Sequence, residues 1–105
     1  MILTQRARDI GLDEAEYTEL LKLFAETSRS ELNAIRAAIA SGDVHMALCA
    51  AHSIKGASAN LGLKDISEEA RTIEERSREG RLDGIGDAVL ELEGLLAGIE
   101  RSLKE

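Results

Sequence analysis

The stretch LDGIGDAVLELEGLLAGIERSL, residues 82–103, places apolar residues at alternating intervals of three and four. These residues are Leu82, Ile85, Val89, Leu92, Leu96, Ile99 and Leu103. On a helix of about 3.6 residues per turn they form one stripe, a pattern typical of the seam of a helical bundle or coiled coil. The stretch therefore predicts a long helix with one face packed against other helices.

Four glycines divide the rest of the chain, at positions 11, 42, 62 and 80. The segments between them also repeat apolar residues with a helical period, and helices commonly end at such glycines. The first segment predicts a helix that begins near Asp13, with Glu16 at the spacing of a capping box, and ends before Ser41. Its core-facing residues are expected to be Tyr17, Leu20, Phe24, Leu32, Ile35 and Ile39.

Two further helices are predicted, one from about Asp43 to Gly62 and one over residues 64–79. The former is expected to bury Ala47, Ala50, Ala51, Ile54 and Leu61. The latter is expected to lie on the surface, with a narrow packed stripe of Ile66, Ala70 and Ile73. Residues 2–10 are expected to form a short helix that caps one end of the bundle, with its apolar residues turned inward, namely Ile2, Leu3 and Ile10.

Amphipathic helices joined by short connections predict an all-α fold, an antiparallel up-and-down four-helix bundle with a short N-terminal capping helix. The composition agrees with helices, because proline is absent and the only aromatic residues are Tyr17 and Phe24. A chain of 105 residues is long enough for one hydrophobic core and too short for two. We therefore expect one domain over residues 1–105.

The formal net charge is −7, with 13 basic residues interspersed among 20 acidic ones. This balance argues against a nucleic-acid partner, which needs clustered Lys and Arg. No apolar stretch approaches the roughly 20 residues that cross a bilayer, so no membrane partner is expected. The single cysteine, Cys49, fits a reducing compartment, and the first residues lack the apolar run of a secretory signal. We expect a cytoplasmic monomer.

Chemistry-bearing residues gather in the run AAHSIKGASANLG, residues 50–62. Lys55 follows His52 by three residues and Gly56 follows it by four, so at about 100° of rotation per residue both flank the imidazole. The expected buried residues lie on the opposite face, so His52 points outward. A neutral imidazole offers a lone pair for attack on phosphorus, and the Lys55 ammonium can offset the phosphoryl charge. A glycine inside a helix costs roughly 1 kcal/mol relative to alanine, and open access to the imidazole would explain Gly56.

This run resembles the motif of histidine-containing phosphotransfer (HPt) domains, in which a histidine, a lysine, a glycine and a later glycine stand at these spacings. The resemblance implies that His52 is the phosphoacceptor, Lys55 its charge partner and Gly56 the residue that admits a partner. It also implies that Gly62 closes the histidine-bearing helix. Other residues are similar to the family's usual surroundings, namely Gly42, Asp43, Ala70, Ile73 and Glu74.

The resemblance implies a phosphorelay intermediate. His52 would accept a phosphoryl group from a receiver-domain aspartate, or from a histidine kinase system, and pass it to the aspartate of a response regulator. The expected partners are receiver domains of response regulators and of hybrid histidine kinases. The chain has no Gly-rich phosphate loop, so we expect a phosphotransfer protein that does not bind ATP or phosphorylate itself. No cofactor or metal is expected on this chain, and the receiver is expected to supply Mg²⁺.

The outer face around His52 is the expected docking surface for a receiver. Its residues on the helical wheel are His45, Leu48, Cys49 and Ala59, followed by Leu63 and Lys64 at the end of the helix. The apolar contact is expected from Leu48, Ala59 and Leu63.

Other interpretations remain open. A lone histidine on a helix is most often a plain surface residue, and only the neighbours in the motif favour a functional one. His45, Cys49 and His52 share a face at i, i+4 and i+7 and offer ligands that zinc accepts, although no fourth ligand is apparent. Gly94 and Gly98 form a G-x-x-x-G pair that could admit a helix of a second chain, as in a purely structural or oligomerising bundle.

Overall fold

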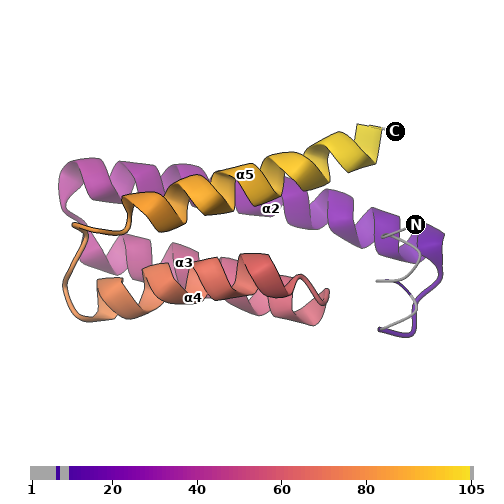
Figure 1. Cartoon of the computed structure of the whole chain (residues 1–105), viewed down its shortest axis with the longest axis horizontal. Helices are drawn as coiled ribbons and strands as arrows, with labels where there is room; N and C mark the ends of the chain where they lie inside the picture. The colour runs from indigo at the N-terminus through magenta and orange to yellow at the C-terminus, as the bar shows by residue number, and fades with distance from the viewer. Residues whose placement is uncertain (1–6, 8–9, 105) are drawn as a thin grey trace.

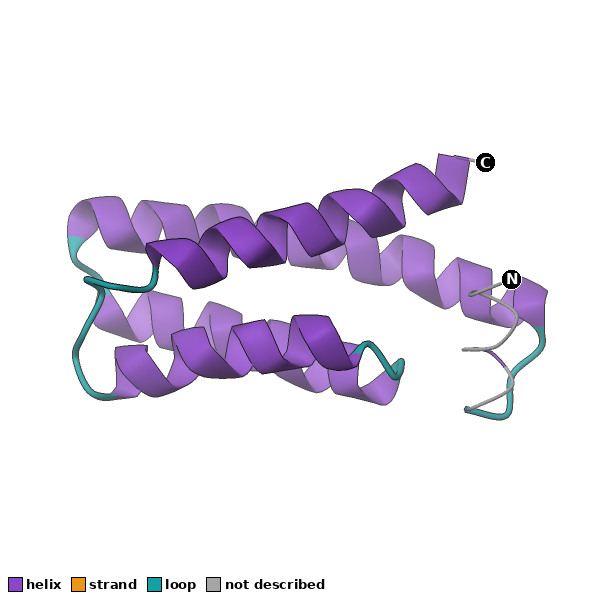
Figure 2. Cartoon of the chain, in the orientation of Figure 1, coloured by secondary structure: helices purple, strands orange, loops and turns teal. Residues whose placement is uncertain are grey.

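The structure is a computed structural model that describes residue 7 and residues 10–104. Within these residues it contains four helices and no strand. The helices are α2 (Glu14–Ser41), α3 (Val44–Asn60), α4 (Lys64–Arg78) and α5 (Gly86–Lys104). Each packs against the helices before and after it in the chain, and α5 also packs against α2, which closes the ring (Figure 1). The predicted antiparallel up-and-down bundle is confirmed, with only short connections between the helices (Figure 2).

The helix ends follow from local sequence. At the start of α2 the Asp13 side chain accepts a hydrogen bond from the Glu16 backbone N–H at 2.7 Å, and the Glu16 side chain accepts one from the Asp13 N–H at 3.4 Å. This confirms the predicted capping box. The helix ends where Gly42 takes a φ of 74°, a left-handed conformation that glycine adopts without steric cost. Asp43 then caps α3 by accepting from the Met46 N–H at 3.0 Å.

The buried residues confirm most of the predicted apolar stripes. The prediction that Leu20 and Ile39 of α2 face the core is wrong. Leu20 and Ile39 are 41 % and 38 % exposed, whereas Leu21 and Ala38 beside them are fully buried. Leu20 and Ala38 lie five turns apart at the same angle on the helical wheel, and so do Leu21 and Ile39, so the buried face turns around α2 along its length, as expected for packed helices that wind around one another. The buried residues of α2 are Tyr17, Leu21, Phe24, Ala25, Ser28, Leu32, Ile35 and Ala38.

The C-terminal helix begins later than the spacing of its apolar residues predicts. Leu82 lies in the connection from α4 and is half-buried against the core, and Ile85 is fully buried just before α5. Gly84, with a φ of 82°, sets the turn between them. The Ile85 carbonyl accepts the Val89 N–H at 3.0 Å, so the helical hydrogen bonds start there. Leu82 and Ile85 both pack against the core although they precede the helix, so the apolar spacing in the sequence begins before α5 does.

The predicted N-terminal capping helix falls mainly outside the described residues, which include neither Ile2 nor Leu3. Ala7 is buried in the core, and Ile10 is half-buried against it. None of the helices in the described part of the chain is long and apolar enough to cross a membrane.

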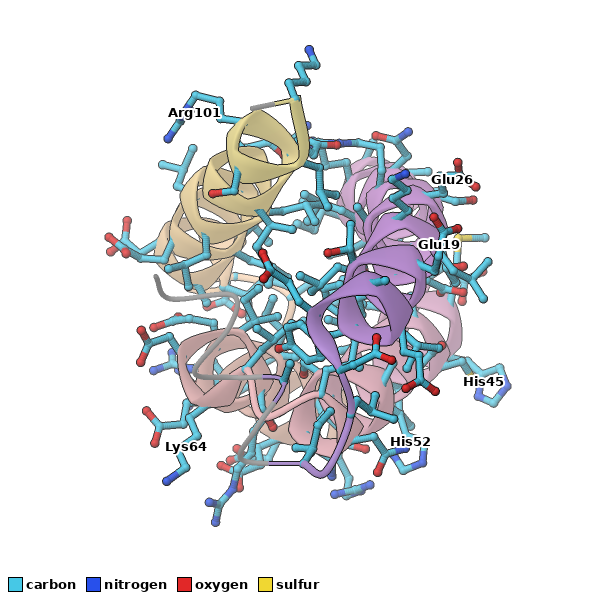
Figure 3. The ribbon with its side chains drawn as sticks, turned by 90° about the vertical axis from the view of Figure 1, so that its right-hand side faces the viewer. Glu19, Glu26, His45, His52, Lys64 and Arg101 are labelled. Atoms are coloured by element: carbon cyan, nitrogen blue, oxygen red, sulfur yellow. The ribbon has the colours of Figure 1, made fainter. Side chains whose placement is uncertain are left out.

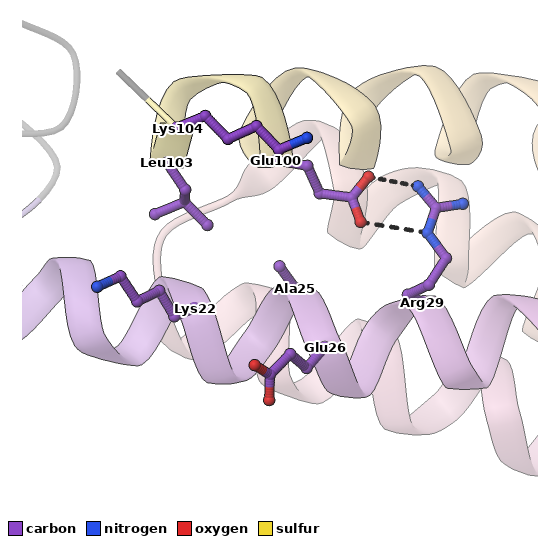
Figure 4. A pocket seen from close by; sticks show the side chains of 7 residues that line it. All are labelled: Lys22, Ala25, Glu26, Arg29, Glu100, Leu103 and Lys104. Carbon is purple, nitrogen blue, oxygen red and sulfur yellow. Dashed lines mark hydrogen bonds and ion pairs between the residues drawn. The ribbon is translucent and has the colours of Figure 1, made fainter.

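Ion pairs join α2 to α5 on the side of the bundle away from α3 and α4. The Arg29 guanidinium contacts Glu100 and Glu93, each at 2.5 Å, and Figure 4 shows the paired contact with Glu100 beside an open pocket. The hydrogen bond from Arg29 holds the pKa of Glu93 below its ordinary value, although partial burial opposes the shift. These contacts fix α2 and α5 relative to each other.

Candidate functional site

His52 lies on the outside of α3, where its side chain is 67 % exposed. The opposite face of the helix is buried, as predicted, through Ala47, Ala50, Ala51 and Ile54. Viewed along the bundle, both His45 and His52 project away from the ribbons (Figure 3). The packing of α3 therefore presents the imidazole to solvent, as the helical period required.

A buried carboxylate from α4 holds the imidazole. Glu74 is 1 % exposed, and its Oε2 contacts His52 Nδ1 at 2.5 Å. Its other oxygen, Oε1, accepts a hydrogen bond from Lys55 Nζ at 2.5 Å. Arg78 Nη2 donates to Oε2 at 3.4 Å. One acidic side chain thus connects the imidazole to two cations, and all of them lie along the line where α3 packs on α4.

The ionisation of Glu74 decides which imidazole nitrogen is available. Burial pushes the pKa of Glu74 upward, but hydrogen bonds and charge from Lys55 and His52 outweigh it, so the pKa lies below its ordinary value of 4.5. An ionised carboxylate can only accept, so Nδ1 of His52 carries the hydrogen in this contact. No residue that the structure describes is hydrogen-bonded to Nε2. Nε2 is therefore the nitrogen that faces outward, and it carries the lone pair when the imidazole is neutral.

Further contacts fix α3 against its neighbours. The Tyr17 hydroxyl from α2 donates to the Leu61 carbonyl at 2.7 Å, and Ser67 of α4 donates to the Lys55 carbonyl at 3.4 Å. The helix ends at Asn60, and Gly62 follows with a φ of 74°. The expected place of Gly62 at the end of the histidine-bearing helix is therefore confirmed.

Gly56 is exposed one turn after His52. A Cβ built on it would meet no atom within 4 Å, so packing inside this chain does not require a glycine at this position. The helical destabilisation that a glycine brings has no intramolecular reason here. This observation removes packing against the rest of the described chain as a reason for Gly56.

The residues of the expected docking surface are not all available to a partner. His45, Cys49, Ala59 and Lys64 are exposed, and Leu48 is half-buried. Leu63 is only 3 % exposed, so the prediction that its side chain contacts a partner is wrong. The left-handed turn at Gly62 directs Leu63 back between the helices, where its N–H donates to the Ser58 carbonyl at 2.9 Å.

Two parts of the site were missed from the sequence. Glu74 was noted only as part of the family's surroundings, although an acidic residue one turn after Ala70, beside the buried stripe of α4, is the signal that could have found it. The second part is an apolar pocket beside the C-terminal half of α3. Its lining comes from three segments, namely Ile10 and Leu12, then Leu20, Leu23, Phe24 and Thr27 of α2, then Ala57, Asn60 and Leu61.

The three residues weighed as zinc ligands do not converge. Cys49 Sγ contacts His45 Nε2 at 3.5 Å, while His52 turns toward Glu74. Cys49 is exposed. Among the residues that the structure describes, no three His, Cys, Asp or Glu side chains are grouped so that they could hold a metal ion.

The glycine pair of α5 is not used for close packing within this chain. A Cβ on Gly94 would meet no atom within 4 Å, and one on Gly98 would reach only the flexible end of Arg101, at 3.8 Å. Close approach of α2 therefore does not explain these glycines.

Comparison with known proteins agrees with this arrangement. A protein-family model described as the Hpt domain matches residues 19–102. The crystal structure of histidine-containing phosphotransfer protein B (HptB) from Pseudomonas aeruginosa PAO1 superposes with a TM-score of 0.79 and 31 % sequence identity. The match covers 87 % of this chain and 79 % of that one. No match was found among curated protein sequences.

Proposed function

This chain belongs to the Hpt domain family, which serves histidine phosphotransfer in phosphorelays, and we propose that His52 is its phosphoryl acceptor, on Nε2. The observation that carries the proposal is the contact between Glu74 Oε2 and His52 Nδ1, which leaves Nε2 as the outward nitrogen. We further propose that a receiver-domain aspartate donates the phosphoryl group and that a response-regulator aspartate receives it. The protein would act as a cytoplasmic monomer.

The transfer step follows from this geometry. The Nε2 lone pair attacks the phosphorus of the aspartyl phosphate, a P–N bond forms, and the P–O bond breaks with its electron pair leaving on the aspartate carboxylate. The imidazole ring gains positive character as Nε2 becomes bonded to phosphorus. Glu74, which accepts the Nδ1 hydrogen, stabilises that charge and keeps the ring orientation fixed. The return reaction uses the same contacts in reverse.

The residues around His52 provide positive charge for the phosphoryl group, and the phosphoryl donor comes from outside this chain. Lys55 follows His52 by one turn of α3, and its Nζ donates to Glu74, which also contacts the imidazole. We propose that it offsets phosphoryl charge, that the donor is another protein and not ATP, and that the receiver provides the Mg²⁺. This chain then contributes a positioned nucleophile and a surface for docking.

We propose that the docking surface extends from α3 onto α2. Ala57 and Asn60, which follow Gly56 on α3, line the apolar pocket, and Leu20 and Leu23 line it from α2 with exposures of 41 % and 61 %. Large exposed apolar side chains grouped at a pocket are typical of a protein contact. The receiver is the partner that must approach His52 closely, so it is the occupant that we assign to this surface.

The docking surface is tested by a pair of matched substitutions. Leu23→Glu places a charge on the proposed surface, and Leu90→Glu does the same at a leucine on α5 that is 67 % exposed. We expect Leu23→Glu to weaken binding of a cognate receiver by roughly tenfold, because it replaces an apolar contact with a charge, and Leu90→Glu to leave binding unchanged. Titration calorimetry measures both. Equal affinities for the two variants would place docking elsewhere.

The role of Gly56 is tested by separating stability from access. Gly56→Ala is expected to stabilise the fold by up to about 1 kcal/mol, because the added methyl meets no atom of the chain and alanine favours the helix. The same variant is expected to slow transfer from a receiver, because the methyl group narrows the approach to His52. Urea unfolding and transfer kinetics measure the two effects.

Gly94→Ala is the control for this substitution, since it lies on α5 in equally open space. It should raise stability by a similar amount without changing transfer. Transfer rates for Gly56→Ala equal to those of the unaltered protein would remove access as the reason for this glycine.

The proposed function as a whole is tested by incubating the protein with a receiver domain that carries radiolabelled phosphate. Label should move to this chain, and acid should release it while base does not, as for a phosphorus–nitrogen bond on histidine. Absence of label with every receiver tested would contradict the proposal.

A further inference from the structure

Two cations contact one buried carboxylate beside His52. Lys55 and Arg78 both donate to Glu74, at 2.5 Å and 3.4 Å. With a neutral imidazole, the side chains of this cluster carry one negative and two positive charges. The immediate surroundings of His52 are therefore positive in a chain whose formal net charge is −7. Within this cluster of described side chains, two cations share one anion, so one positive charge is available to an anionic group that arrives at the imidazole.

The two cations reach His52 from opposite sides. Lys55 follows His52 by one turn along α3, whereas Arg78 follows Glu74 by one turn along α4. Because α3 and α4 are antiparallel, these two displacements point in opposite directions along the line of contact. Arg78 and the imidazole share the same oxygen, Glu74 Oε2, so they are close neighbours. A group on Nε2 would thus have Lys55 on one flank and Arg78 on the other.

Arg78 is the more easily released of the two cations. Its side chain is 62 % exposed and its contact with Glu74 is long, whereas the Lys55 side chain is 33 % exposed and its contact is short. The guanidinium end of this i, i+4 pair is mostly in solvent and its contact is long, so exchanging one anion for another costs Arg78 little. A guanidinium can also donate two parallel hydrogen bonds to phosphoryl oxygens, which an ammonium cannot do with the same geometry.

We propose that Arg78 is a second phosphoryl-binding residue, which turns from Glu74 to the phosphoryl group when His52 is phosphorylated. The inference rests on the proposed function of His52. In the transfer step a P–N bond replaces the P–O bond, the electron pair stays on the aspartate, and the site gains one unit of negative charge. Arg78 takes up that charge, while Lys55 remains with Glu74. Arg78 thereby favours the phosphorylated state of this chain over that of the receiver.

The experiment compares Arg78→Gln with Arg71→Gln. Arg71 is the matched control, because it also forms an i, i+4 pair on α4, with Glu75 at 3.0 Å, and is 68 % exposed. Each protein is phosphorylated with phosphoramidate, a small phosphoryl donor that needs no docking, and the phosphoryl group is titrated by ³¹P NMR. Loss of a neighbouring cation should raise the pH at which the group takes up its last proton. We expect that rise for Arg78→Gln and none for Arg71→Gln.

The second readout is the equilibrium of phosphoryl transfer with a receiver domain. Arg78→Gln should shift it toward the phosphorylated receiver by roughly tenfold, the effect of one charge-assisted hydrogen bond at a half-exposed site. Arg78→Lys should recover part of the shift, and Arg71→Gln should show none. Identical titrations and equilibria for Arg78→Gln and the unaltered protein would overturn the inference. Failure of the unaltered protein to be phosphorylated at His52 by either donor would instead contradict the proposed function.

Discussion

Replacing His52 with glutamine is expected to abolish phosphorylation by a receiver domain while leaving the bundle folded. The imidazole side chain is 67 % exposed, so the fold loses little packing when it is removed. A glutamine amide can still donate a hydrogen bond to Glu74, but its nitrogen has no nucleophilic lone pair. The loss of transfer should be on the order of a thousandfold or more, because no alternative nucleophile replaces the imidazole. Transfer of radiolabelled phosphate, quantified after base treatment, measures it.

The control for this substitution is His45→Gln. His45 is the second of the chain's two histidines, is exposed and lies on the same helix two turns earlier. Its replacement should leave transfer unchanged, and circular dichroism should show the same helix content in both variants. If His52→Gln still took up label and His45→Gln did not, His45 would be the acceptor and our assignment to His52 would be wrong.

Replacing Glu74 with glutamine is expected to reduce both transfer and stability. The substitution removes the charge that supports the imidazole ring in the transfer step and leaves Lys55 without its anion. In metal sites, loss of a carboxylate that orients a histidine ligand lowers affinity or activity by about 10- to 100-fold, and we expect a loss of that order here. The unfolding free energy at pH 7 should fall by about 1–3 kcal/mol, the cost of weakening hydrogen bonds to a buried charged group. Transfer kinetics and urea unfolding measure the two effects.

The loss of unfolding free energy caused by Glu74→Gln should become smaller as the pH falls. The folded-state pKa of Glu74 lies below its ordinary value of 4.5, because Lys55 and His52 overcome the effect of burial. Its contribution is therefore present above about pH 4.5 and is lost as the pH falls through the folded-state value. The difference in unfolding free energy between Glu74→Gln and the unaltered protein should shrink in acid.

Glu75→Gln is the control, because Glu75 is the next residue on α4 and its side chain is 54 % exposed. Its exposed pair with Arg71 should contribute less than 1 kcal/mol, so stability and transfer should both stay close to those of the unaltered protein. Equal losses in the two glutamine variants would show that the buried position of Glu74 has no special role.

The positions of the helices could be read from the sequence because they depend on local rules. Asp13 and Glu16 start α2 through backbone hydrogen bonds within one turn, and the glycines that follow the helices supply left-handed residues. The two errors at Leu20 and Ile39 concern how the buried face turns along α2, because Leu21 and Ala38 at the same two angles are buried. Periodicity within a helix gives a buried face, but its turn along a long helix depends on how the neighbouring helices wind around it.

The sequence by itself determined that His52, Lys55 and Gly56 share the outer face of one helix, because residues three and four apart are neighbours on any α-helix. Only the tertiary structure decided which groups hold that face. Glu74 is 22 residues from His52, and the register of α4 against α3 places its carboxylate on Nδ1. The same packing brings Arg78 to the site and turns Leu63 inward. The physical reason is that contacts between helices depend on their relative register and rotation, which no single helix contains.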